Sequence, residues 1–197
     1  MNWDFMRSDV PERFWATIWA DMEAYCRRLK PHRRFPSFVA VIDVLLEPGF
    51  LAVLLFRIGH LFYRYHLGLF ARLCHIANVV FFGFDMRPAA YAGPGLVIPH
   101  PTGMQLFARI GRDVILYGQV LIGAGGYEQG REGLPSIGDG VTVFAGAKIF
   151  GPVTVGADAV IATAALVLKP VPAGAIAMGM PAKVVRFKDG YGRRRAS

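Results

Sequence analysis

Hydrophobic residues recur at every sixth position through the second half of the chain. The eleven anchor positions of this repeat are Ile98, Met104, Ile110, Leu116, Ile122, Ile137, Val143, Ile149, Val155, Ile161 and Val167. An α-helix has a period of 3.6 residues and cannot keep such a spacing on one face. A six-residue repeat instead predicts a parallel β-helix, whose coil has three flat sides, with the anchors pointing into the interior.

The side chain four residues after each anchor is mostly small or β-branched, as expected for a position in the corner of such a coil. These corner positions are Thr102, Ala108, Val114, Val120, Val141, Ala147, Val153, Ala159 and Ala165. The repeat is interrupted once, because Ile122 and Ile137 stand nine residues further apart than one step. We expect residues 124–135 to leave the stack of coils as a loop, and loops on rigid scaffolds are frequent sites of function.

Residues 1–84 have the pattern of a helical domain. A first helix is predicted after a cap at Ser8 or Asp9, a second after Ser37, which the pair Pro48-Gly49 would end, and two more over 50–66 and 69–82. The last two are apolar around most of their circumference, which indicates burial against partners or contact with a membrane interface. We therefore divide the chain into a helical domain (1–84), a β-helix domain (85–186) and a basic C-terminal tail (187–197).

Composition narrows the class of protein. Of the 197 residues, 54% are hydrophobic and 18% charged, which excludes a disordered chain. The longest stretch free of Asp, Glu, Lys and Arg, 88–108, holds four prolines, so we expect no membrane-spanning helix. Two cysteines make no disulfide framework and no signal peptide is visible, so a cytoplasmic protein is expected, either free or peripheral at the inner face of the membrane. The net charge of +8 favours cofactor phosphates or acidic lipids as partners, because no nucleic-acid-binding motif accompanies it.

Several segments resemble a known family. They are RIGH at 57–60, FDMRPAA at 84–90, GPGLVIPHPTG at 93–103, IGRDV at 110–114 and PVPAGAIAMGMPAKVV at 170–185. Together with the interrupting loop, they make roughly residues 45–186 similar to the serine O-acetyltransferases, within the hexapeptide-repeat acyltransferases. The resemblance implies a left-handed β-helix and a homotrimer, which some members pair into a hexamer through the helical domain. It also implies acetyl-CoA, bound in a groove between neighbouring subunits.

By this resemblance, His100 is the general base and Asp85 orients it. Transfer of an acetyl group to a hydroxyl needs a base, and an imidazole with a pKa of about 6.5 suits that role. A carboxylate on the other ring nitrogen fixes the tautomer and stabilises the imidazolium that forms. Asp85 lies 15 residues before His100, close to one coil, so the two could meet on adjacent coils or across a subunit contact. The alternative for Asp85 is a cap where the last helix enters the coils.

The resemblance also marks where the cofactor would lie. The backbone that meets the pantetheine arm is implied at Gly123, Ala145, Gly146 and Thr163, and the candidates for the phosphates are Lys169, Lys183 and Arg186. Small residues also suit the corners of any β-helix, and the basic residues could equally form a solvated face.

The acceptor pocket departs from the family pattern. Pro99 stands where the family has an aspartate before the catalytic histidine, and Gly133 and Leu134 replace an Arg-His pair. A zwitterionic amino acid needs charged partners, which Pro99 and Leu134 do not offer. We therefore predict an altered substrate pocket at Pro99 and Leu134 around a retained acetyl-transfer chemistry.

Three alternatives to a serine O-acetyltransferase stay open. The first is an O-acetyltransferase for a sugar, a polysaccharide precursor or another non-serine intermediate, which the apolar helices and the altered pocket favour. The second is a non-catalytic trimeric scaffold, which the retention of Asp85 and His100 argues against. The third is a zinc carbonic anhydrase of the same fold, which needs three histidines at its metal. The repeat region has one histidine, so no metal is expected.

Overall fold

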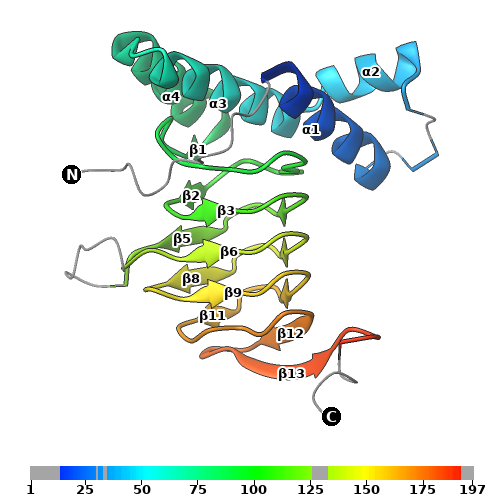
Figure 1. Ribbon diagram of the computed structural model, residues 1–197, viewed down its shortest axis with the longest axis vertical. Coiled ribbons are helices and arrows are strands. Elements are labelled where there is room, and N and C mark those ends of the chain that lie inside the picture. The colour runs from blue at the N-terminus through cyan, green and yellow to red at the C-terminus, as the bar shows by residue number, and fades with distance from the viewer. Residues whose placement is uncertain (1–13, 30, 33–34, 126–132, 192–197) are drawn as a thin grey trace.

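A layer of four helices lies at one end of the computed structural model, which describes residues 14–29, 31–32, 35–125 and 133–191 (Figure 1). The helices are α1 (Phe14–Leu29), α2 (Phe38–Leu45), α3 (Pro48–Arg64) and α4 (Gly68–Phe82). The side chain of Ser37 caps α2 by accepting a hydrogen bond from Ala40 N, as predicted. Pro48 and Gly49 open α3 instead of ending α2, because proline is well suited to the first turn of a helix. The predicted cap at Ser8 or Asp9 lies outside the described residues.

Thirteen short strands follow the helices in the described chain. They are β1 (Phe84–Asp85), β2 (Met104–Leu106), β3 (Arg109–Ile110), β4 (Ile115–Leu116), β5 (Leu121–Gly123), β6 (Ser136–Ile137), β7 (Thr142–Val143), β8 (Lys148–Phe150), β9 (Thr154–Val155), β10 (Val160–Ile161), β11 (Leu166–Val167), β12 (Ala175–Met178) and β13 (Lys183–Phe187). All their pairings are parallel except that of β12 with β13. The predicted order of helices first and parallel strands second is confirmed.

The strands form three sheets, which the chain visits in turn. The sheet orders are β1-β2-β5-β8-β11, β13-β12-β10-β7-β4 and β3-β6-β9. Paired residues in successive strands are 18 positions apart below the interruption: Ser136 with Thr154, Thr142 with Val160, and Lys148 with Leu166. Across the interruption, Leu121 pairs with Lys148, so nine extra residues are accommodated without a break in the sheet.

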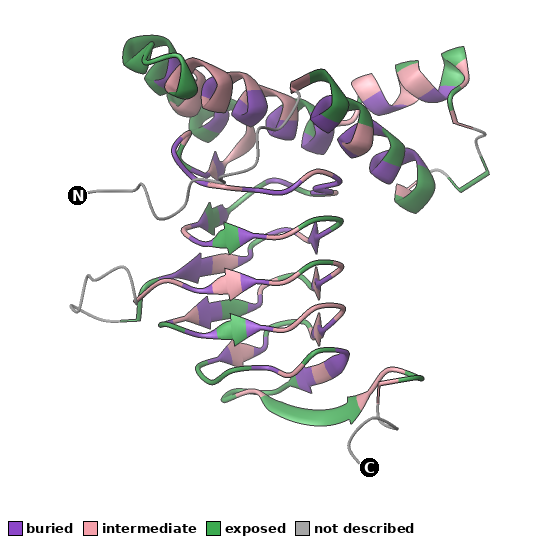
Figure 2. Cartoon of the chain, in the orientation of Figure 1, coloured by how far each residue is buried: buried purple, intermediate pink, exposed green. Residues whose placement is uncertain are grey.

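The anchor residues fill the interior between the three sheets. All eleven are at most 2% exposed, and the corner positions are also buried, except Thr102, which is exposed. Ala52, Val53 and Phe56 of α3 belong to the same hydrophobic core as the strands, so the helices pack directly on the first coil (Figure 2). The division at residue 84 stays a prediction, because one core runs through both parts.

The two predicted peripheral segments are described only in part. Ala124 and Gly125 are exposed at the start of the interrupting loop, residues 126–132 lie outside the described chain, and β6 resumes at Ser136. At the C-terminal end, β13 pairs with β12, and residues 192–197 of the predicted basic tail lie outside the described chain. No single described helix is long and apolar enough to cross a membrane; α2 and α3 pass that test only when counted together, across a break bent by 79°.

Candidate active site

His100 lies in an exposed turn just before β2, at the edge where the sheet of β4 and β7 meets the sheet of β2 and β5. The next coil packs closely under this turn. A Cβ atom on Gly118 would lie 3.0 Å from His100 O and 3.3 Å from His100 Cβ, so only glycine fits without a shift. The backbone of the next coil is therefore held close under His100, and His100 itself is exposed.

Turns from successive coils stack below His100 into one column. Gln119 N donates to Thr102 O at 3.1 Å, Gly146 N to Gly118 O at 3.0 Å, and Ala164 N to Ala145 O at 3.0 Å. The structure thus brings Ala145, Gly146 and Thr163 onto the same edge as His100. Neighbouring strands lie about 4.8 Å apart, so the three steps span roughly 14 Å. Ala145 and Thr163 are exposed along this edge.

The remaining predicted cofactor residues lie elsewhere. Gly123 ends β5 at the other edge of the same sheet and is buried, and Gly151 N donates to Gly123 O at 3.1 Å. Lys169 follows β11 on that far edge, whereas Lys183 opens β13 at the bottom of the stack, and Arg186 lies further along β13. Lys169, Lys183 and Arg186 are exposed.

The two predicted pocket residues are not brought together within one chain. Pro99 adjoins His100, whereas Leu134 lies at the end of the interrupting loop, on the opposite edge of the sheet. Leu134 is partly buried and packs against the main core. Their shared role in one acceptor pocket stays a prediction.

A buried tyrosine holds the segment that leads to His100. The hydroxyl of Tyr25 on α1 donates to Ile98 O at 3.0 Å and accepts from Ile98 N at 2.9 Å. Burial raises the pKa of Tyr25, so the hydroxyl keeps its proton and can both donate and accept a hydrogen bond. Gly49 at the start of α3 touches the same residue, because a Cβ there would lie 1.7 Å from Ile98 O. Two helices therefore fix the backbone two residues before His100.

A buried ion pair holds the preceding segment. Arg57 on α3 donates through Nε to Asp21 Oδ2 on α1 at 2.9 Å, through Nη1 to Ala92 O and through Nη2 to Gly93 O. Asp21 Oδ1 in turn accepts from the backbone N–H groups of Gly95 and Leu96, at 2.8 and 2.9 Å. Burial raises the pKa of Asp21, while Arg57 and the two amides act to lower it. This network was not predicted from the sequence, although the charged Asp21 beside Ile18 and Met22 on an apolar helix face was a visible signal for it.

Asp85 contacts a histidine other than the predicted one. Its Oδ1 accepts a hydrogen bond from His75 Nε2 on α4 at 2.9 Å. Asp85 lies on β1, one coil above Gln105, and among the described residues its carboxylate makes no hydrogen bond with His100. The orientation of His100 by Asp85 stays a prediction, and His75 is a further residue that the sequence analysis did not single out.

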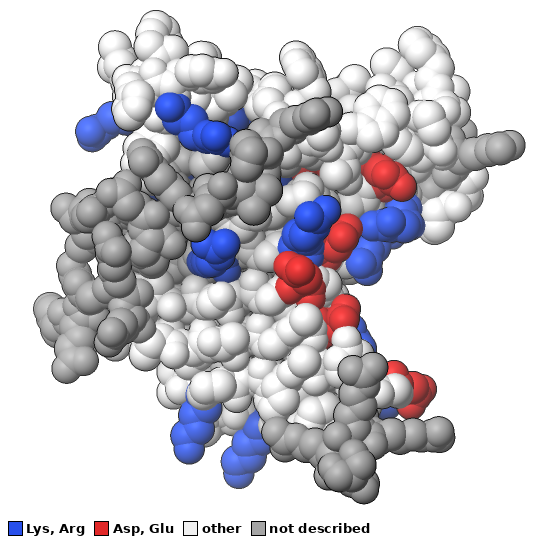
Figure 3. All heavy atoms as spheres, in the orientation of Figure 1, with Lys and Arg blue, Asp and Glu red and all other residues white. Residues whose placement is uncertain are grey.

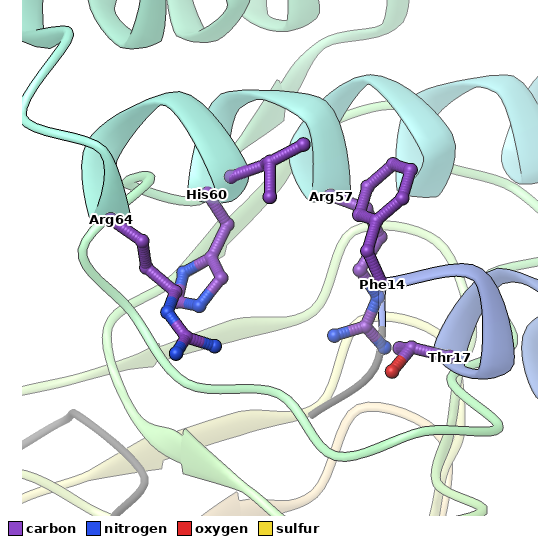
Figure 4. Close-up of a pocket in the computed structure, with 6 residues that line it drawn as sticks. Phe14, Thr17, Arg57, His60 and Arg64 are labelled. Carbon is purple, nitrogen blue, oxygen red and sulfur yellow. The ribbon is translucent and has the colours of Figure 1, made fainter. Parts of the chain in front are cut away.

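A small cavity lies beside the ion pair, between α1 and α3. It has a volume of about 30 Å³, and Figure 4 shows His60 and Arg64 pointing to one side of α3 and Arg57 pointing toward Thr17. One water needs roughly 10–15 Å³ by this measure, so the cavity is too small for a cofactor or an acceptor. Among the described residues, no group of three His, Cys, Asp or Glu side chains could hold a metal ion.

The chain is similar in sequence and in structure to known serine acetyltransferases. Models of known protein families give no match. The chain is 36% identical to a serine acetyltransferase of Helicobacter pylori over 145 residues, which cover 72% of this chain and 84% of that protein. It is 34% identical to one from Mycobacterium tuberculosis over 155 residues, 77% of this chain and 67% of that protein. The crystal structure of the Neisseria gonorrhoeae serine acetyltransferase superposes with a TM-score of 0.78 at 30% identity, over 88% of this chain and 65% of that chain.

These similarities place the chain among the hexapeptide-repeat acyltransferases. Within that class it belongs to the serine acetyltransferase family. The predicted family is confirmed, and so is the predicted class of enzyme, an O-acetyltransferase that uses acetyl-CoA. The chain spans slightly less than two thirds of the gonococcal protein, at 65% of its length.

Proposed function

We propose that this chain transfers an acetyl group from acetyl-CoA directly to an acceptor hydroxyl, with His100 as the general base. One observation carries the proposal: His100 is exposed at the head of a column of turns whose exposed members include Ala145 and Thr163. A long, narrow thioester can lie along such an edge with its carbonyl beside the imidazole. A solved serine acetyltransferase of similar fold was determined in complex with CoA, with a TM-score of 0.75 at 31% identity.

The chemistry follows from an imidazole placed beside a thioester. His100 takes the proton of the acceptor hydroxyl as its oxygen attacks the thioester carbonyl, and a tetrahedral oxyanion forms. Collapse of that intermediate breaks the C–S bond, and the imidazolium returns the proton to the departing thiolate of CoA. Backbone N–H groups of the turns beside His100 are the donors available to the oxyanion. Asp85 would orient the imidazole if the assembled protein brings the two together.

Serine is the first acceptor to test, because a gonococcal relative was solved in complex with serine. The replacement of the family's charged residues by Pro99 and Leu134 favours a second candidate, a hydroxyl on a sugar or another non-serine intermediate. That candidate gains support from the exposed apolar side chains of the helical layer, such as Phe38, Leu69 and Phe81, at 83%, 69% and 77%. The top of this layer is largely uncharged in the view of Figure 3.

We further infer that the three sheets wind as a left-handed β-helix and that three chains assemble with the cofactor groove between neighbours. The parallel strand registers and the similarity to serine acetyltransferase structures support this inference. The exposed apolar faces of α2 and α4 would then be covered either by a second trimer or by a membrane surface. Light scattering gives the number of chains, and sedimentation with acidic lipid vesicles tests membrane contact. We propose that the protein is cytoplasmic. Sedimentation together with the vesicles would indicate that it binds peripherally to the membrane.

Acceptor profiling tests the function. The purified chain is mixed with acetyl-CoA and with serine, homoserine or a sugar panel, and release of the CoA thiol is followed with a thiol reagent. His100→Asn should lower kcat by roughly 100-fold or more. His66→Asn is the matched control, because His66 is exposed in the turn between α3 and α4 and asparagine tolerates its positive φ of 60°. Retention of most activity by His100→Asn would refute the assignment, and absence of both thiol release and CoA binding would favour the scaffold.

A further inference from the structure

One side of α4 is apolar and exposed along the length of the helix. Its side chains are Leu69, Leu73, Ile76 and Val80, which are between 49% and 69% exposed. Their spacing of four, three and four residues places them on one face. The opposite face packs on α3, where the buried Asn78 donates to Ala52 O at 2.9 Å. The apolar stripe of α4 therefore faces away from the rest of the molecule.

The outer side of α2 is apolar as well. Phe38 and Ile42 are 83% and 40% exposed, and Leu46, directly after the helix, is 72% exposed. The other side of α2 is buried in a hydrophobic core that includes α1, through Ala40 and Val44. A helix that is apolar all round is usually buried all round. Both helices lie at the end of the molecule farthest from the last coil (Figure 1), and their exposed apolar side chains are named here the outer apolar face.

The charge around α4 is one-sided. Residues 48–84 contain Arg57, Arg64 and Arg72 but no Asp or Glu. Arg57 is buried in its ion pair with Asp21. Arg64 and Arg72 are exposed, and neither makes a salt bridge with a residue that the structure describes. The helices that carry the apolar stripe therefore offer positive charge alone to a partner.

A second group of basic residues precedes α2. It consists of Arg27, Arg28, Lys30, Arg33 and Arg34, and residues 24–42 contain no Asp or Glu. Arg28 is exposed, and Arg27 pairs with Asp113 at 3.1 Å but stays 55% exposed. The two acidic residues of the following stretch, Asp43 and Glu47, are half-buried and already interact within the chain. A cluster of about four to eight basic residues beside an apolar helix is typical of proteins that bind acidic lipids.

A second copy of the chain matches this face poorly. In a two-fold contact each face meets its own copy, so Arg64 and Arg72 would approach a hairpin that has no carboxylate. Like charges brought together without a counter-ion oppose such a contact. The surface of an acidic bilayer supplies both missing partners, because its hydrocarbon accepts the apolar side chains and its phosphates accept the arginines.

We propose that the outer apolar face inserts into the surface of a membrane that contains acidic lipids. α2 and α4 then lie in the interface, and Arg64 and Arg72 reach the headgroups. His100 follows Ile98, which α1 contacts through Tyr25, so the candidate active site lies at the end of the stack nearest the lipid. This partner goes beyond the proposed acetyl transfer, and its binding does not depend on that activity.

Co-sedimentation of the full chain with lipid vesicles tests the insertion. The unaltered chain should bind vesicles of phosphatidylcholine and phosphatidylglycerol. Leu73→Ser should weaken this binding about tenfold, because it removes an apolar side chain that lipid would bury. Leu168→Ser is the matched control, since Leu168 is 51% exposed against 53% for Leu73 but lies after β11, toward the other end of the stack. Circular dichroism confirms that both variants keep their fold.

A second pair of variants tests the charge. Arg72→Gln should weaken binding to the acidic vesicles about fivefold and leave binding to pure phosphatidylcholine vesicles unchanged. Arg112→Gln is the matched control, because Arg112 is exposed in the turn between β3 and β4, away from the outer apolar face. It should bind both kinds of vesicle as the unaltered chain does.

Four results would overturn the proposal. The first is that the unaltered chain does not sediment with acidic vesicles, and the second is an equal loss in Leu73→Ser and Leu168→Ser. The third is a loss in Arg72→Gln without one in Leu73→Ser, which would mean adsorption by charge alone. The fourth is a Leu73→Ser variant with fewer chains per particle in light scattering without lipid, which would assign the face to a second copy. Acetyl transfer measured without vesicles tests the proposed function separately, so either proposal can fail alone.

Discussion

Removal of the Tyr25 hydroxyl should destabilise the protein through one backbone residue. In Tyr25→Phe, both the N–H and the carbonyl of Ile98 lose their partner inside a fully buried region. A buried polar group left without a partner costs about 1–3 kcal/mol. With two such groups, we expect the free energy of unfolding to fall by about 2–6 kcal/mol, a large part of the roughly 5–15 kcal/mol of a typical domain.

Urea unfolding followed by circular dichroism measures this loss. Tyr65→Phe is the control, because Tyr65 is 71% exposed at the end of α3 and its variant should change stability by less than about 0.5 kcal/mol. The same variants report on His100, which lies two residues after Ile98. A shift of the imidazole of about 1 Å can cost roughly 100-fold in rate. We therefore expect Tyr25→Phe to lower kcat by about 10- to 100-fold, with KM for acetyl-CoA little changed. The activity is measured under conditions in which the variant is still folded.

Two results would count against this reasoning in different ways. An unfolding free energy within about 0.5 kcal/mol of the unaltered chain would mean that the hydroxyl does not hold Ile98. If the unfolding free energy falls by the expected amount but kcat is unchanged, the hydroxyl holds the segment around Ile98 but does not position His100. Only the joint loss supports a structural link from α1 to the turn that carries His100.

Three further variants or conditions test other parts of the structure. Asp21→Asn leaves the buried guanidinium of Arg57 without its carboxylate and should cost about 3–5 kcal/mol in urea unfolding, and a cost below 1 kcal/mol would contradict a buried pair. Ile149→Ala removes a fully buried anchor and should cost about 2–5 kcal/mol, against under about 0.5 kcal/mol for the exposed Val184→Ala. Burial raises the pKa of Cys74 above its ordinary 9.0, so the stability that the neutral thiol contributes is complete below pH 9 and is lost as the pH rises through the folded pKa. Alkylation of Cys74 at pH 9, followed by mass spectrometry, should accordingly be slower in the native chain than in urea.

The strands were predictable because their signal is local and repeated. Each anchor, such as Ile110 or Val155, pairs with an anchor of the adjacent coil. A six-residue repeat in the sequence therefore becomes a stack of hydrophobic side chains in the structure. The insertion between Ile122 and Ile137 interrupts the count without changing that relation. Thr102 departs from the buried corner pattern, and it lies in the turn that carries His100.

The side-chain network under the helices could not be predicted from periodicity. Asp21 meets Gly95 and Leu96 across separations of 74 and 75 residues, and no repeat in the sequence encodes such a contact. The pairing of Asp85 with His75 is local, across ten residues from α4 to β1, but neither residue belongs to the six-residue repeat. A family resemblance transfers the type of residue at a position more readily than its partner.

The helical layer covers the top of the stack of coils and takes the place of a further coil there. The segment 92–98 has a strand partner below it, through the bridges Ala92 to Ile110 and Val97 to Ile115, and an end coil otherwise leaves N–H and carbonyl groups exposed. Here Asp21, Arg57 and Tyr25 satisfy those groups with side chains. An end closed by another coil would continue the regular hydrogen-bond ladder over the turn that carries His100. An end closed by side chains can hold residues 92–98 rigidly and still leave His100 open to solvent, which an imidazole that serves as a general base for an outside acceptor requires.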